Sequence, residues 1–158
     1  MTEDFFKYQA QTTPHPLALE ISHAKGSYIY TSNGERHLDF VAGVSACSLG
    51  HSHPKVVEAI KTQVDSYMHV MVYGEYIQKP AVDLTKYIAK HSPENLNQTY
   101  LVNSGTEAIE GALKLAFKSF NGQRKYVLHS DISYHGRLIA SGSISGAEDY
   151  EKNFQKIP

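Results

Sequence analysis

The chain has 158 residues, 41% of them hydrophobic and 20% charged, which corresponds to about one domain with the composition of a globular protein. Its 15 Lys and Arg residues and 16 Asp and Glu residues give a net charge of -1, which argues against a nucleic-acid-binding protein, because such proteins carry a basic surface. The sequence has neither the run of about twenty apolar residues that spans a membrane nor the positive start of a signal peptide, so we expect a cytoplasmic protein.

The first part of the chain is predicted to form an arm followed by a β-hairpin. Residues 1–26 are polar and contain two prolines close together, which favours an extended segment that lies against something else. Residues 27–40 consist of two short strand-like runs around Asn33 and Gly34. Asn-Gly is the dipeptide most typical of a tight hairpin turn, so we expect the two runs to pair.

Two helices are predicted next, after a loop rich in Gly and Ser over residues 43–53. Pro54 stands where the first helical residue favours proline, and apolar residues recur at helical spacing as far as Met68. A second helix is expected to begin at Pro80 and to stop at residues 91–93, which include another proline.

The pattern then changes to that of a β-α-β unit in an α/β sheet. Residues 100–102 and 125–128 are short apolar runs, which predict two strands, and residues 104–120 have the apolar spacing of a helix between them. Within this helix, Glu110 and Lys114 have the spacing of an i,i+4 ion pair.

The start of that helix is the most informative part of the sequence. Ser104 and Glu107 have the spacing of a capping box. The first turn of a helix leaves backbone N–H groups without partners at the positive end of the helix dipole, so it can hold an anion such as phosphate. Gly105 would let the anion come close, and the Thr106 hydroxyl would add a donor. The spacing alone is equally compatible with a capped helix that binds nothing.

Four segments resemble the class III aminotransferases, a pyridoxal-phosphate-dependent family that includes acetylornithine, ornithine and 4-aminobutyrate aminotransferases. The most specific match is residues 101–108, LVNSGTEA, which resemble the family's cofactor-phosphate motif. Residues 33–43, 49–54 and 133–137 fall in register with further family motifs. The resemblance covers nearly the whole chain.

The resemblance implies a role for five residues in the second half of the chain. Ser104, Gly105 and Thr106 would hold the phosphate of pyridoxal phosphate at the helix start. Tyr134 would stack on the cofactor's pyridine ring, and Arg137 would bind a substrate carboxylate through its planar guanidinium group. From the residues alone, the two side chains could equally be an ordinary buried tyrosine and a surface arginine.

Two further positions bear on substrate and metal binding. Val44 stands where ornithine aminotransferases carry a tyrosine and where acetylornithine and 4-aminobutyrate enzymes carry an aliphatic residue, so the resemblance favours a substrate other than free ornithine. His51 and His53 could both reach one metal ion, but a catalytic zinc needs three protein ligands, so we predict no metal site. For His135 we favour a structural role.

The resemblance implies the first part of a fold type I enzyme, with an incomplete large-domain sheet. Residues 1–53 would form the arm and hairpin of the small-domain part, and residues 54–158 would begin the cofactor-binding large domain. The activity implied is transfer of an amino group from an amino acid or a terminal amine to a 2-oxo acid such as 2-oxoglutarate, by a homodimer.

The family's Schiff-base lysine lies beyond the matched segments. We therefore assign no catalytic residue within the chain and expect the chain to be inactive alone. The alternative is a non-catalytic module that binds a phosphate-bearing ligand or serves assembly.

Overall fold

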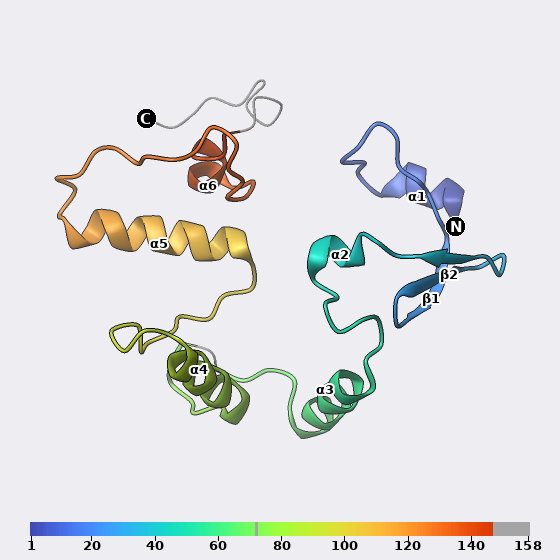
Figure 1. Cartoon of the computed structure of the whole chain (residues 1–158), viewed down its shortest axis with the longest axis horizontal. Coiled ribbons are helices and arrows are strands. Elements are labelled where there is room, and N and C mark those ends of the chain that lie inside the picture. Colours follow the sequence, from blue (N-terminus) through green and yellow to red (C-terminus); the bar gives the residue numbers. More distant parts are fainter. Residues whose placement is uncertain (72, 147–158) are drawn as a thin grey trace. The chain divides into compact units, whose positions relative to one another are not determined.

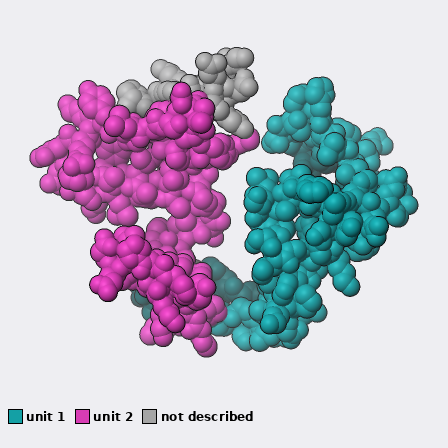
Figure 2. Space-filling view, viewed as in Figure 1, with its two compact units in different colours: residues 1–76 teal, residues 77–158 magenta. Residues whose placement is uncertain are grey.

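The computed structural model describes residues 1–71 and 73–146. Its contacts divide the chain into two compact units, Met1–Tyr76 and Ile77–Pro158, which Figure 2 shows in teal and magenta. The first unit holds a small β-sheet, and the described part of the second is built from helices and loops. The assignment of residues 1–53 and 54–158 to a small-domain part and a large domain stays a prediction.

The sheet of the first unit has three antiparallel strands in the order β1-β2-β3 (Figure 1): β1 (Ile21–Lys25), β2 (Tyr28–Thr31) and β3 (Arg36–Leu38). The predicted hairpin is confirmed, since β2 and β3 pair on either side of Asn33 and Gly34. Gly34 has a φ of 88°, a left-handed conformation that glycine adopts without steric cost.

The prediction of an extended arm over residues 1–26 was wrong at both ends. The chain begins with helix α1 (Thr2–Tyr8), whose first turn carries Glu3 and Asp4 and whose last turn carries Lys7. These charges complement the helix dipole and are the sequence signal that the proline-based interpretation overlooked. At the other end, residues 21–25 form strand β1 because they pair with β2. A strand needs such a partner, and a short polar sequence does not show whether one is present.

The segment after the hairpin makes one left-handed turn, α2 (Ala42–Ser45). Its four residues have φ values of 49°, 60°, 57° and 68°. Only Gly43 adopts this conformation readily, and Val44 is a β-branched residue, for which it is strained. The Val44 side chain is 87% exposed, so it gains little packing within the described residues in return.

Polar bonds tie this segment back to the sheet. The backbones of Gly26 and His51 exchange two hydrogen bonds of 3.0 and 2.8 Å, and the Ser52 hydroxyl donates to the Ala24 carbonyl at 2.9 Å. The His51 ring lies 2.6 Å from the Asp39 carboxylate, measured from Nε2 to Oδ2. His51 therefore anchors the turn that leads into the next helix.

The two central helices confirm the sequence prediction. Helix α3 (Pro54–Ser66) begins at the proline that predicted it, and α4 (Lys79–His91) begins one residue before Pro80. Both have proline in the first turn, where its missing N–H costs no hydrogen bond. Lys90 and His91 end α4, where positive charge complements the helix dipole.

The third predicted helix is also present, as α5 (Gly105–Ser119), and a short helix, α6 (Ile139–Ser143), follows it. The predicted strands at residues 100–102 and 125–128 were wrong, because neither pairs with any described residue. A helix satisfies its backbone hydrogen bonds internally, whereas a strand of a parallel sheet needs a neighbour on the same sheet. None of the described residues supplies that neighbour.

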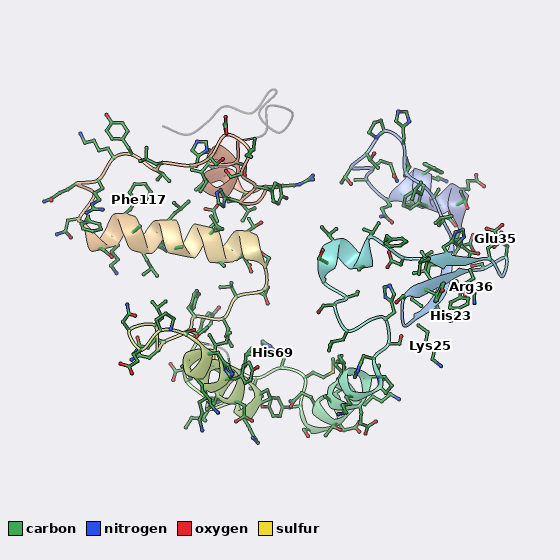
Figure 3. The ribbon with its side chains drawn as sticks, in the orientation of Figure 1. His23, Lys25, Glu35, Arg36, His69 and Phe117 are labelled. Atoms are coloured by element: carbon green, nitrogen blue, oxygen red, sulfur yellow. The ribbon has the colours of Figure 1, made fainter. Side chains whose placement is uncertain are left out.

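The described residues bury no hydrophobic side chain. Among residues 1–71 and 73–146, the buried residues that carry a side chain are Thr31, Ser141 and Ser145. Apolar side chains of α5 stay exposed instead, among them Leu115 and Phe117, and Figure 3 labels the latter. Hydrogen bonds and backbone pairing, more than an apolar core, therefore hold the described elements together.

Candidate phosphate-binding site

The start of α5 carries the predicted cap. Ser104 is extended, with φ of −147° and ψ of 158°, and its hydroxyl oxygen accepts a 3.2 Å hydrogen bond from the Glu107 backbone N–H. The Glu107 carboxylate accepts a 2.8 Å bond from the Asn103 N–H, one residue before the position of an ideal capping box. The cap fixes the direction in which the first N–H groups of α5 point.

Two of those groups have no hydrogen-bond partner among the described residues. Within the part of the chain that the structure describes, no hydrogen bond involves the backbone N–H of Gly105 or of Thr106. Ser104 and Gly105 are exposed, and a Cβ added at Gly105 would meet no atom within 4 Å. The helix start is thus open to an anion from outside, at the end where the helix dipole is positive.

A loop lies directly against this helix start. A Cβ on Gly136 would come closer than 3.0 Å to three atoms of the Thr106 side chain, and Gly136 has a φ of 128°. Only glycine fits this contact, which brings residues 133–137 to the first turn of α5. Sequence reasoning placed Gly136 in a family motif without giving it a role, because the contact joins residues thirty positions apart.

The same loop brings together two predicted site residues. Arg137 donates from Nε to the Tyr134 phenol oxygen at 3.3 Å. The Tyr134 side chain is 57% exposed, so it is not the buried core tyrosine that the sequence left open. Five of the predicted residues thus fall on one helix start and the loop against it, whereas Val44 belongs to the first compact unit.

Glu110 does not form the ion pair that its spacing predicted. The ion pairs found among the described residues do not include Glu110 with Lys114. Instead, Glu110 Oε1 accepts a 2.7 Å hydrogen bond from the Ser141 backbone N–H in α6. A bond to a buried N–H is worth more than an exposed ion pair, which explains the preference.

The described residues show neither a cluster of metal ligands nor a membrane-spanning helix. Residues 1–71 and 73–146 contain no group of three or more His, Cys, Asp or Glu side chains arranged to hold a metal ion. His51 is instead engaged with Asp39. No helix in the described part of the chain is long and apolar enough to cross a membrane.

The chain is similar in sequence to acetylornithine aminotransferases of several organisms. The chain is 36% identical over 137 residues to the acetylornithine aminotransferase of Clostridium acetobutylicum, a match that covers 84% of this chain and 34% of the relative. It is also 36% identical over 153 residues to the acetylornithine aminotransferase of Methanothermobacter thermautotrophicus, covering 96% of this chain and 37% of the relative. The chain thus spans about a third of the length of the curated relatives that it matches.

Solved structures share the fold. An omega-transaminase from Thermomicrobium roseum superposes with a TM-score of 0.87 at 23% identity, covering 99% of this chain and 37% of that one. The omega-transaminase of Pseudomonas jessenii, solved in complex with PMP, gives a TM-score of 0.84 at 22% identity, covering 100% and 37%. These neighbours have the fold of pyridoxal-phosphate-dependent transaminases, fold type I, as predicted.

The family itself is shown by a match across most of the chain. The family model described as Aminotransferase class-III matches residues 8–158, which include the cap of α5 and the loop that lies against it. The match begins at Tyr8, the last residue of α1, and includes every described residue after it. This chain therefore belongs to the class III aminotransferases.

Proposed function

We propose that the chain is the cofactor-phosphate-binding portion of a pyridoxal-phosphate-dependent aminotransferase. The whole enzyme would move an amino group from an amino acid or a terminal amine to a 2-oxo acid such as 2-oxoglutarate, as a homodimer. Family membership and the names of the acetylornithine aminotransferase relatives support the reaction class. The open start of α5, with its two unpartnered N–H groups, is the observation that carries the binding site.

The residues present fit a phosphate group. The N–H groups of Gly105 and Thr106 would donate to its oxygens, in the positive field of the helix start. The Ser104 oxygen already accepts from Glu107, but its hydroxyl hydrogen can still turn toward an anion. The Thr106 hydroxyl would add another donor. Because a Cβ at Gly105 meets nothing, the space beside this residue is available to the ligand.

Tyr134 and Arg137 would contact the rest of the cofactor and the substrate. When bound, pyridoxal phosphate supplies an electron sink for amino-group transfer. The Tyr134 ring would stack on the cofactor ring, and Arg137 would bind the substrate carboxylate with a charged, planar group. The bond from Arg137 Nε to the Tyr134 oxygen restrains the guanidinium group and ties the two roles together. Val44 would contribute to the choice of substrate.

We assign none of the chain's own lysines to the covalent step, so activity would need a lysine from outside residues 1–158. The second candidate, a non-catalytic assembly module, is favoured by the exposed apolar side chains of α5. We expect the pure chain, given pyridoxal phosphate, glutamate and a 2-oxo acid, to show no turnover. Turnover together with a borohydride-fixed adduct on a residue within the chain would contradict this assignment.

The phosphate site is tested by Gly105→Leu, with Gly111→Leu as the matched control. Both glycines lie in α5, and a Cβ at either meets no atom within 4 Å, so neither change should clash. Gly105→Leu should weaken the binding of pyridoxal phosphate by about tenfold or more, since it blocks charge-assisted hydrogen bonds.

Both substitutions should keep or raise the helical circular dichroism signal, because leucine is the better helix former. Gly111→Leu should bind the cofactor as the wild-type chain does. Equal affinity of the Gly105→Leu variant and the wild-type chain would defeat the assignment.

A further inference from the structure

The second compact unit places two serine side chains where a core would normally place apolar ones. Ser141 is 0% exposed and Ser145 is 1% exposed. A buried hydroxyl is stable only when it is hydrogen-bonded, and such a group is costly to leave unpaired. The bonds that these residues make therefore indicate what this part of the chain holds in place.

Ser145 binds the loop that lies against α5. Its hydroxyl oxygen accepts a 2.9 Å hydrogen bond from the His135 backbone N–H. The hydroxyl hydrogen can be donated to the Ser141 carbonyl at 2.9 Å or to the Gly136 carbonyl at 3.5 Å. Ser145 thus holds the backbone at His135, next to the glycine that touches Thr106.

Glu110 holds α6, the helix that precedes Ser145, against α5. It projects from the second turn of α5, and its carboxylate accepts from the buried Ser141 N–H at 2.7 Å. Figure 1 shows α6, which contains Ser141, beside the first half of α5. One carboxylate on α5 therefore fixes α6, and Ser145, just after α6, fixes the loop.

We infer that Ser145 and Glu110 are positioning residues that hold residues 134–137 against the phosphate-binding start of α5. The inference rests on the proposed function, since it assigns these bonds to the same site. Neither residue would touch the ligand. Their effect on the ligand would pass through Gly136. This residue lies so close to the Thr106 side chain that only the hydrogen atom of a glycine fits between them.

The test uses the whole chain, labelled for NMR, and the variant Ser145→Ala. Ser119→Ala is the matched control, because the Ser119 hydroxyl also donates to the carbonyl four residues earlier but lies at the far end of α5. Three quantities are measured: exchange of the His135 amide hydrogen, the nuclear Overhauser effect between Gly136 and the Thr106 methyl group, and affinity for pyridoxal phosphate.

Ser145→Ala should speed His135 exchange and weaken cofactor affinity, each by about tenfold, which corresponds to losing one buried hydrogen bond. It should also remove the Gly136–Thr106 signal, while the helical circular dichroism stays at the wild-type level. Ser119→Ala should change none of the three quantities.

Glu110 provides a second, independent variant pair. Glu110→Ala should reproduce the effects of Ser145→Ala, and Glu110→Gln should preserve wild-type behaviour, because its amide oxygen can still accept from Ser141. If Glu110→Gln also speeds His135 exchange, removes the Gly136–Thr106 signal and weakens cofactor affinity, the negative charge of Glu110 is what these properties require. That result would overturn the positioning role of Glu110.

The outcomes separate this inference from the proposed function. If Ser145→Ala leaves His135 exchange and the Gly136–Thr106 signal unchanged, or if the wild-type chain lacks that signal, the inference is overturned. If both respond but cofactor affinity does not, the link to the phosphate site is overturned. If both respond and the wild-type chain binds no pyridoxal phosphate, the proposed function fails and the positioning of the loop stands.

Discussion

Asp39 joins three segments through a single carboxylate. One oxygen contacts the His51 ring at 2.6 Å, and the other accepts from the N–H groups of Val41 and Ala42 at 3.0 and 2.9 Å. The bond to His51, followed by the bond from Ala42, holds the pKa of Asp39 below its ordinary value. The charged carboxylate therefore fixes the entry to the left-handed turn that contains Val44.

The lowered pKa sets the pH range in which this arrangement holds. The pKa of Asp39 is lower in the folded chain than in the unfolded one, so its contribution to stability is complete above the unfolded value and is lost as pH falls through the folded value. We expect the protection of the Val41 and Ala42 amides, measured as the exchange rate relative to the intrinsic rate at each pH, to be lost as pH falls through the folded pKa, below about pH 4.

Asp39→Ala should give fast exchange at Val41 and Ala42 at neutral pH already, because alanine has no side-chain oxygen to accept from either amide. The control is Asp83→Ala, which removes an exposed carboxylate paired with Lys79 on α4 and should leave both amides unaffected. Slow exchange at the two amides in the Asp39→Ala variant would show that the carboxylate does not hold the turn.

At the scale of elements, α5 combines a cap with a candidate binding site at the same residue. Ser104 satisfies the Glu107 N–H, and the N–H groups of Gly105 and Thr106 stay available. Aspartate caps a helix as well as serine does, but its negative charge would repel a phosphate group. Substitution of Ser104 can therefore separate the two roles.

Ser104→Ala should lower the stability of α5 by about 1 kcal/mol, because it removes the cap. Ser104→Asp should keep the stability of α5 and still weaken cofactor affinity. Helical circular dichroism during urea unfolding and a binding titration measure the two effects. Wild-type cofactor affinity in the Ser104→Asp variant would mean that the cap residue is no part of the site.

The elements that the sequence predicted correctly are those with local signals. Pro54 and Pro80 begin helices, Ser104 caps one, and Asn33-Gly34 turns a hairpin. The strand predictions that were wrong concern segments that need a pairing partner. The runs at residues 100–102 and 125–128 have a strand's composition but no strand beside them among the described residues.

The candidate site divides in the same way. The residues that we propose for phosphate binding, Ser104, Gly105 and Thr106, are contiguous in sequence and were predicted from their order. The supporting contacts of Gly136, Glu110 and Ser145 join positions ten to about thirty residues apart, and no periodic sequence pattern predicts such contacts. Glu110 even carried a misleading local signal, the spacing to Lys114.

At the scale of the whole chain, the absence of buried apolar side chains from the described residues is the dominant feature. Helix α5 exposes Leu115 to 62% and Phe117 to 43%, and α3 exposes Ile60 to 59%. Apolar surfaces of this kind normally contact other protein. The relatives are about two and a half times as long as this chain, which gives such surfaces additional sequence to pack against in those proteins.

We therefore expect the chain alone to bind a hydrophobic dye and to self-associate as its concentration rises. Its thermal unfolding should absorb much less heat than the roughly 0.7 kcal/mol per residue of a two-state globular domain. Calorimetry and analytical ultracentrifugation measure these properties, with the whole acetylornithine aminotransferase of Clostridium acetobutylicum for comparison. A monomer that unfolds in one sharp, high-enthalpy transition would contradict the expectation.

We propose the start of α5 as the site that binds the cofactor's phosphate group. The most direct measurement is a titration of the labelled chain with pyridoxal phosphate, followed through the backbone amide signals of α5. Binding at the start of α5 should give saturable shifts at Gly105 and Thr106, a smaller shift at Gly136, and none at Gly111 in the middle of the helix. Signals at Gly105 and Thr106 that stay in place while the cofactor binds elsewhere, or does not bind, would contradict the proposal.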